Sequence, residues 1–277
     1  MEESSEAGTT EAQTEITTEA APDIDIEKVE LLSLNDVEAV SGCPEICDTE
    51  SFKARHKDDV EQFYSSDYGE NNKEYSQLAA LEMVSPDYET SEYKYIADDF
   101  DNDGETEYYL IIENKQNVAD DFCNGGFDDI SSRNFGKSVT FYYIEDSGEA
   151  EFVSFMNCVS ATSEITFYKI ADYGSSKHLV YCYWPAYDGV GGSGNARLFD
   201  KTRFFDMTYG GVFADGDGIL KASTYTLVYE YIWDGADYTA IEYDYDMPDE
   251  NGELIELDDY HINRTAGPDK VKWFSGK

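Results

Sequence analysis

Four acidic side chains stand in one short stretch with the spacing that calcium-binding loops use. The stretch from Asp99 to Glu107 follows the pattern Asp-x-Asp-x-Asp-Gly-x-x-Glu. Calcium takes roughly six to eight oxygen ligands in a flexible geometry, and acidic residues at loop positions 1, 3 and 5 can converge on one ion. Glycine at position 6 permits the turn, and the backbone carbonyl at position 7 can ligate. We therefore predict a structural Ca²⁺ site formed by Asp99, Asp101, Asp103, Glu105 and Glu107.

A solvated acidic turn that binds no ion is the alternative interpretation of this stretch. A helical EF-hand or a dockerin is not predicted, because position 12 would need an acidic residue and holds Leu110 within an apolar run. A second acidic sequence, Asp215-Gly216-Asp217-Gly218, offers only two carboxylates. We interpret that sequence as a glycine-rich turn, since two carboxylates make a poor cage for an ion.

Aromatic residues on a predicted strand form a second candidate site. They are Tyr181, Tyr183, Trp184 and Tyr187, and flat aromatic rings can stack on sugars or peptides. Alternation along the strand places Tyr181 and Tyr183 on one face, and Cys182 and Trp184 on the other. Packing in the core is the alternative role for these rings.

The glycine-rich stretch 189–195 matches neither of two catalytic patterns. A nucleophile elbow would need glycine where Asn195 stands, and a phosphate loop would need a following Lys-Ser or Lys-Thr pair. We predict a flexible hairpin loop. The histidines, His56, His178 and His261, are scattered, which favours surface or core roles. With 60 acidic residues, a carboxylate pair suited to glycoside hydrolysis always stays possible.

Short alternating runs separated by turn residues predict antiparallel hairpins. The abundance of Tyr and Phe, 23 and 15 residues, also favours β structure. The acidic loop lies inside the first hairpin, and Asp234-Gly235 in the last one favours a type I′ turn. The hairpins pair 93–96 with 108–112, 139–144 with 152–155, 165–170 with 179–184, and 227–233 with 238–243.

Similar segments in the hairpins predict an internal duplication. Residues 94–98 match 168–172, and residues 142–146 match 230–234. We infer two modules of two hairpins each, at about 93–157 and 165–246, with a longer insertion in the second. The predicted fold is mainly β, with antiparallel hairpins in two repeated four-stranded units arranged as propeller-like blades or a sandwich. A small α-containing part precedes them.

The chain divides into three predicted regions, of which 93–277 is the β-rich repeat domain. Residues 1–27 hold nine acidic residues and no Lys or Arg, so we expect a disordered acidic tether. Residues 28–92 should be a mixed α/β segment that packs on the β domain. The elements expected there are strands at 29–32 and 37–40 and helices at 58–64 and 73–84.

The acidic loop and its flanks, residues 93–113, resemble the calcium loops of FG-GAP and VCBS-type repeats. They also resemble a single-copy acidic hairpin found in lipoproteins of gut Clostridia. The resemblance implies a loop that joins two strands of a blade and binds calcium. The corresponding loop of the second module, 172–176, lacks the carboxylates, which departs from families that bind an ion in every blade. Residues 1–27 likewise resemble the tether that follows the anchor cysteine of bacterial lipoproteins.

The net charge of −41 in 277 residues limits the possible partners. Such a surface repels nucleic acid and anionic lipid. No apolar run approaches the ~18 residues of a membrane span, so direct insertion is not expected. The chain start lacks signal-peptide features, so either the protein is cytoplasmic or a leader is removed; the tether favours the second.

The number of cysteines is odd, so at least one is free or pairs between chains, and a zinc site is not expected. They are Cys43, Cys47, Cys123, Cys158 and Cys182.

These observations predict a non-enzymatic, extracytoplasmic protein, secreted or at the cell surface. We expect a lipoprotein of a Gram-positive bacterium whose calcium-stabilised β domain binds a glycan or a surface protein. The alternative is a secreted, glycosidase-like hydrolase that uses acidic residues in an aromatic cleft.

Overall fold

The computed structural model describes most of the predicted β domain and part of the segment before it. The described residues are 27–34, 39–40, 49–66, 91–117, 135–145, 148–160, 163–187, 190–191, 195–207, 211–223, 227–244, 265–266 and 271–276. No helix among them is long and apolar enough to cross a membrane. Their elements are β1 (Glu30–Leu34), β2 (Ala39–Val40), α1 (Glu50–Tyr64), β3 (Glu92–Asp98), β4 (Glu107–Asn117), β5 (Phe135–Ile144), β6 (Ala150–Ser160), β7 (Ser163–Asp172), β8 (Lys177–Tyr187), β9 (Val190–Gly191), β10 (Asn195–Asp200), β11 (Arg203–Met207), β12 (Gly211–Ala214), β13 (Leu220–Ser223), β14 (Leu227–Trp233), β15 (Tyr238–Asp244), β16 (Thr265–Ala266) and β17 (Phe274–Ser275).

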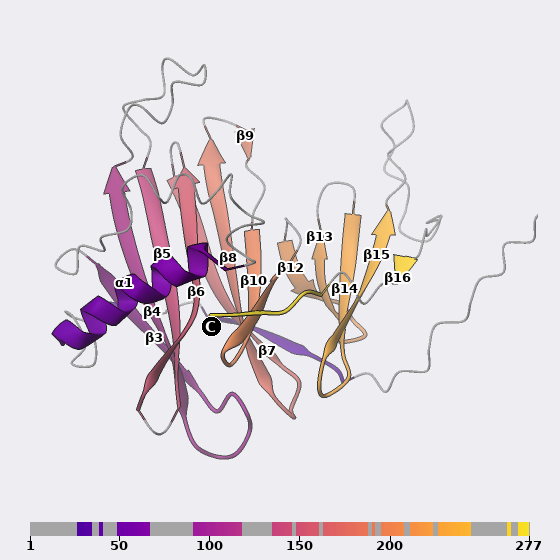
Figure 1. The fold of residues 1–277 in the computed structure, drawn as a ribbon. Coiled ribbons are helices and arrows are strands. Elements are labelled where there is room, and N and C mark those ends of the chain that lie inside the picture. The colour runs from indigo at the N-terminus through magenta and orange to yellow at the C-terminus, as the bar shows by residue number, and fades with distance from the viewer. Residues whose placement is uncertain are drawn as a thin grey trace, which may run out of the picture.

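The described strands form three antiparallel sheets that fan across the molecule (Figure 1). The first sheet has the order β2-β3-β4-β5-β6, and the third has the order β12-β13-β14-β15-β16. The central sheet has the order β1-β7-β8-β10-β11-β17, with the short β9 paired to β8. The prediction of a mainly β protein built from antiparallel hairpins is confirmed.

All four predicted hairpins form, but their grouping into two modules is only half right. The first module is the meander β3-β4-β5-β6. The second module is wrong, because β7-β8 belongs to the central sheet and β14-β15 to the third. The predicted insertion between them holds β10 to β13, which complete both sheets. The result is three four-stranded meanders, each extended by one or more extra strands.

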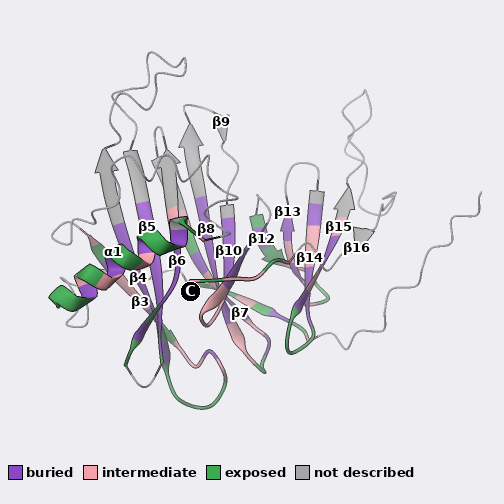
Figure 2. Ribbon diagram, viewed as in Figure 1, coloured by how far each residue is buried: buried purple, intermediate pink, exposed green. Residues whose placement is uncertain are grey.

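Two apolar cores fill the spaces between these layers, and Figure 2 shows buried residues along the described parts of most strands. The first core lies between the first and central sheets, and the second lies between the central and third sheets. Strand β8 contributes to both, since Tyr181 and Tyr183 face the first core while Val180 and Cys182 face the second. The central sheet is therefore covered on both faces. Cys182 is a buried free thiol, and the side chains of the other cysteines lie outside the described residues.

Helix α1 covers the outer face of the first sheet. The Thr49 hydroxyl caps it by accepting a hydrogen bond from the Phe52 amide at 3.1 Å. Phe52 packs on Tyr142 at 5.1 Å between ring centroids, and Phe63 packs on Phe152 at 5.7 Å. The predicted helix 58–64 is the second half of α1, and the predicted strands 29–32 and 37–40 overlap β1 and β2. The predicted helix 73–84 lies outside the described residues.

Both described ends of the chain join the central sheet. The Glu27 amide donates to the Trp233 carbonyl and the Val29 amide to the Gly218 carbonyl, before β1 pairs with β7. At the other end, Trp273 packs on Phe205 at 4.9 Å, and β17 pairs with β11. The two end segments thereby connect the third sheet to the central one.

Candidate metal centre

The acidic loop joins β3 to β4 in the first sheet, as predicted, and Asp98 pairs with Glu107 where the strands meet. The loop is held by its own carboxylates. Asp99 accepts hydrogen bonds from the Asp103 amide at 3.0 Å and the Gly104 amide at 3.1 Å. Gly104 has a φ of 94°, a left-handed conformation that favours glycine. The requirement for glycine at loop position 6 therefore has a direct backbone cause.

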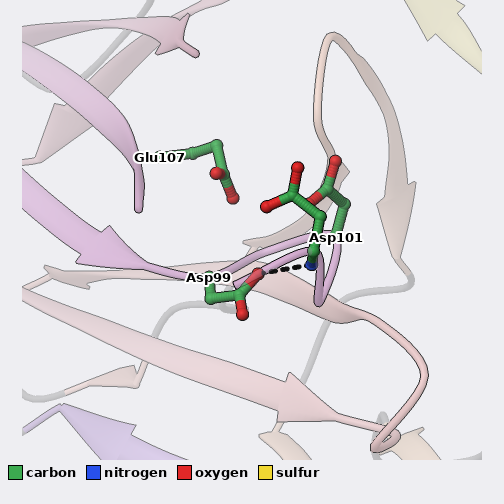
Figure 3. A group of neighbouring side chains, drawn as sticks. Asp99, Asp101 and Glu107 are labelled. Carbon is green, nitrogen blue, oxygen red and sulfur yellow. Dashed lines mark hydrogen bonds between the residues drawn. The ribbon is translucent and has the colours of Figure 1, made fainter. Parts of the chain in front are cut away.

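The structure brings four of the predicted ligands together. Asp99, Asp101, Asp103 and Glu107 each offer an oxygen, and these oxygens lie within 4.8 Å of one another. Figure 3 shows the labelled carboxylates of Asp99, Asp101 and Glu107 around a common space. Glu105 differs, because its side chain is exposed and its amide donates to Asp103 at 2.8 Å. Its predicted role needed only the backbone carbonyl.

Burial and mutual repulsion make the inner carboxylate of this group unfavourable to ionise. The Glu107 side chain is only 4% exposed. Burial raises the pKa of Glu107, the Phe100 amide that donates to it at 2.7 Å lowers it, and the charges of Asp101, Asp103 and Asp99 raise it further. A divalent cation among these oxygens would reverse the effect of the neighbouring charges, because each carboxylate would face a positive centre.

A lysine from the central sheet neutralises part of this charge. Lys201, in the β10–β11 turn, donates to Asp101 Oδ2 at 2.7 Å. The hydrogen bond from Lys201 is the main cause that lowers the pKa of Asp101. The other oxygen, Asp101 Oδ1, is buried and has no hydrogen-bond partner within the described part of the chain. One side of the carboxylate is thus satisfied by the protein, and the other remains available to a ligand.

The acidic loop is also fixed to the β7–β8 hairpin of the central sheet. The Lys177 amide donates to the Phe100 carbonyl at 2.9 Å, and the Lys177 ammonium pairs with Asp98. Asn102 donates to the Gly174 carbonyl at 2.6 Å. The loop is therefore a junction between two sheets, and an ion bound there would stabilise that junction. Sequence reasoning missed Lys177 and Lys201 because they are distant in the chain.

The aromatic site predicted on β8 is not an exposed platform. Tyr181 and Tyr183 are 0% and 2% exposed, since they face the first core. The central sheet is covered on both faces, so side chains from the middle of β8 cannot reach a ligand at the surface. Core packing, the alternative interpretation, holds for these two residues. The side chains of Trp184 and Tyr187 lie outside the described residues.

The remaining turn predictions have mixed outcomes. Asp215 accepts from the Asp217 and Ile219 amides and pairs with Lys221 at 2.9 Å, as a plain turn does. The turn predicted at 234–235 is longer than a two-residue type I′ turn, because four residues, 234–237, separate the strand ends. In the glycine-rich stretch 189–195, β9 pairs with the end of β8, and residues 189 and 192–194 are not described.

The fold and the site together define a class: a three-sheet antiparallel β protein with a cluster of carboxylates at a junction between sheets. A scan of family models and searches of curated proteins and solved structures found no match to this chain.

Proposed function

We propose that this protein is a calcium-stabilised β domain that serves as a binding module outside the cytoplasm. The observation that carries the proposal is the convergence of four carboxylate oxygens within 4.8 Å in a loop that joins two strands. Hard oxygen ligands of this number and charge suit calcium. The strand flanks also agree with the FG-GAP and VCBS-like resemblance, whose loops connect neighbouring strands.

The role of the ion in this proposal is structural. The acidic loop contacts the β7–β8 hairpin and the β10–β11 turn, so a bound ion holds the first and central sheets together at one end. Extracellular calcium modules bind with a Kd of about 10⁻⁴ to 10⁻³ M, which matches calcium levels outside cells better than those inside. The acidic composition of residues 1–27 supports the same setting, a tethered lipoprotein at the surface of a Gram-positive bacterium.

The ligand proposed for the module is a glycan or a surface protein. Four large apolar side chains are notably exposed among the described residues and offer contacts to a ligand: Leu32, Tyr108, Phe167 and Phe213. Tyr108 packs edge-to-face on Tyr95 at 6.2 Å, which makes this pair the aromatic surface nearest the acidic loop along the chain. A binding screen with glycans and surface proteins, with and without calcium, tests this part of the proposal.

A glycosidase-like hydrolase, the alternative function, receives less support. Its two carboxylates would lie about 5–10 Å apart. Within the described residues, the buried acidic side chains are Glu107 and Glu113, both on β4. Six residues of strand separate them by about 20 Å at 3.3 Å per residue. Glu113 is further committed to Lys94 at 2.8 Å and to the Tyr168 hydroxyl at 2.6 Å.

Calcium titration followed by thermal unfolding tests the ion. With a Kd near 10⁻⁴ M, 10 mM Ca²⁺ should stabilise the fold by about 2.7 kcal/mol, a rise in Tm of about 5–10 °C. Asp103→Asn should remove most of that rise, because the carboxylate is a predicted ligand and forms no ion pair with another described residue. Asp217→Asn, in the plain turn, is the matched control and should respond to calcium as the wild type does. An unchanged Tm with calcium or chelator would remove the proposed site.

A further inference from the structure

Two buried polar atoms near the acidic loop have no hydrogen-bond partner within the described part of the chain. They are Oδ1 of Asp101 and the hydroxyl of Tyr143. Tyr143 is 1% exposed, so bulk water does not satisfy its hydroxyl. An unpaired buried polar group is costly, and in native proteins it is usually satisfied by an ordered water or an ion. The position of Tyr143 relative to the carboxylates indicates what could satisfy its hydroxyl.

The strand register places Tyr143 beside the inner carboxylate of the site. Tyr143 on β5 pairs directly with Tyr109 on β4, and Glu107 lies two residues earlier on β4, on the same face. Diagonal neighbours of this kind lie about 7–8 Å apart, and somewhat closer at Cβ, which is within the reach of a tyrosine side chain. Phe100 confirms the proximity, since its ring lies 6.4 Å from that of Tyr143 while its amide donates to Glu107.

Electrostatics agrees with this placement. Burial raises the pKa of Tyr143, and the charges of Glu107, Glu145 and Asp101 raise it further. The phenol hydroxyl can donate a hydrogen bond. A protonated hydroxyl and the unpaired carboxylate oxygen of Asp101 are complementary groups that a water molecule can satisfy together.

We propose that the Tyr143 hydroxyl forms the buried wall of the cation site, where it holds a water molecule of the ion's coordination shell beside Asp101. This inference rests on the proposed calcium site. Four carboxylates do not fill a shell of roughly six to eight oxygens, and calcium sites complete their shells with water. Removing a group that hydrogen-bonds to a metal ligand and orients it typically lowers metal affinity by about 10- to 100-fold. Tyr143 is thus a positioning residue for the ion.

Tyr143→Phe tests the inference through two effects of opposite sign. Calcium affinity, measured by isothermal titration calorimetry, should fall about tenfold because the water loses its partner. The Tm without calcium should stay the same or rise by about 2–4 °C, because an unpaired buried hydroxyl is removed. A residue with only a packing role would leave calcium affinity unchanged, since the ring is retained.

Tyr142→Phe is the matched control, because Tyr142 is the next residue on β5 and points to the opposite face. Its hydroxyl donates to Asp59 of α1 at 3.3 Å, so its loss should lower the Tm without calcium and leave calcium affinity unchanged. Equal affinity of Tyr143→Phe and wild type would overturn the role of Tyr143 while leaving the calcium site in place. If the wild type itself bound no calcium, the proposed function and this inference would fail together.

Discussion

The imidazole of His178 is fully buried between the central and third sheets, and acid should therefore weaken that junction. Nδ1 lies 2.6 Å from the Tyr238 hydroxyl, and Nε2 lies 3.3 Å from the Ser176 hydroxyl and 3.8 Å from Asp200. Burial lowers the pKa of His178 to about 4, the charge of Asp200 raises it, and the charge of Arg203 lowers it. The folded protein thus holds this side chain in its neutral form.

The sign and the size of the acid effect follow from that pKa. In the unfolded chain the pKa of His178 is near 6.5, so the unfolded state binds the proton first as the pH falls. The stability contributed by the neutral form is present above pH 6.5 and is lost between about 6.5 and 4. A difference of about 2.5 in pKa corresponds to about 3 kcal/mol. His56, under α1, adds a loss of the same sign, because burial and the charge of Arg55 lower its pKa to about 4.

Urea unfolding at pH 7, 6, 5 and 4 measures this effect. The wild type should lose stability at up to about 1.4 kcal/mol per pH unit for each histidine. His178→Asn keeps a polar group near Tyr238 but does not titrate, so it should be less stable at pH 7 and have a shallower pH slope. The pKa of Glu107 is raised in the folded state, so protonation of Glu107 at low pH adds stability. This contribution is the same in the wild type and in His178→Asn, so it does not affect the comparison of their slopes. If His178→Asn kept the wild-type slope, the buried neutral histidine would not be its source.

Substitutions at Arg197 test packing, and substitutions at Gly104 and Gly216 test backbone strain. Arg197 is 1% exposed, stacks 4.3 Å over Phe204 and donates to a main-chain carbonyl of β6, so Arg197→Met should lower the unfolding free energy by about 2–3 kcal/mol in urea melts. Arg197→Lys should recover only part of the lost unfolding free energy. If the urea midpoint of Arg197→Met equalled that of the wild type, the buried role of Arg197 would be contradicted. Gly104→Ala should cost about 1–2 kcal/mol because φ is 94°, whereas Gly216→Ala, in open space without a positive φ, should cost little. Equal effects of the two changes would show that the left-handed turn is not required.

Local sequence signals predicted the hairpins well because the two strands of a hairpin are neighbours in the sequence. Alternation and turn residues identify two neighbouring strands, but they carry no information about which sheet the pair joins. The matched segments 94–98 and 168–172 do occupy equivalent first hairpins, of the first and central sheets. The segments 142–146 and 230–234 occupy equivalent second hairpins, of the first and third sheets. Combining them into one module hid the strands between them, β10 to β13, which span only four to six residues each. Strands β10 and β11 complete the central meander, and β12 and β13 begin the third.

The candidate site was predictable to the extent that it is local. The spacing of Asp99, Asp101, Asp103 and Glu107 alone indicated the cluster that the structure brings together. The platform prediction for Tyr181 and Tyr183 was wrong because the covering of both faces of a sheet depends on the order of the sheets. Tyr143 looks like an ordinary core residue until the register of β4 and β5 is known.

The distribution of charge explains why a divalent ion suits this loop. The chain has 19 Lys and Arg residues against 60 acidic ones, so few cations are available to hold acidic turns together. Three lysines perform that task at the turns described above: Lys177 on Asp98, Lys201 on Asp101, and Lys221 on Asp215. The acidic loop still concentrates more carboxylates than Lys177 and Lys201 can balance. A calcium ion would supply two further positive charges at the place where the first and central sheets meet, and it would do so without the entropy cost of ordering another long side chain.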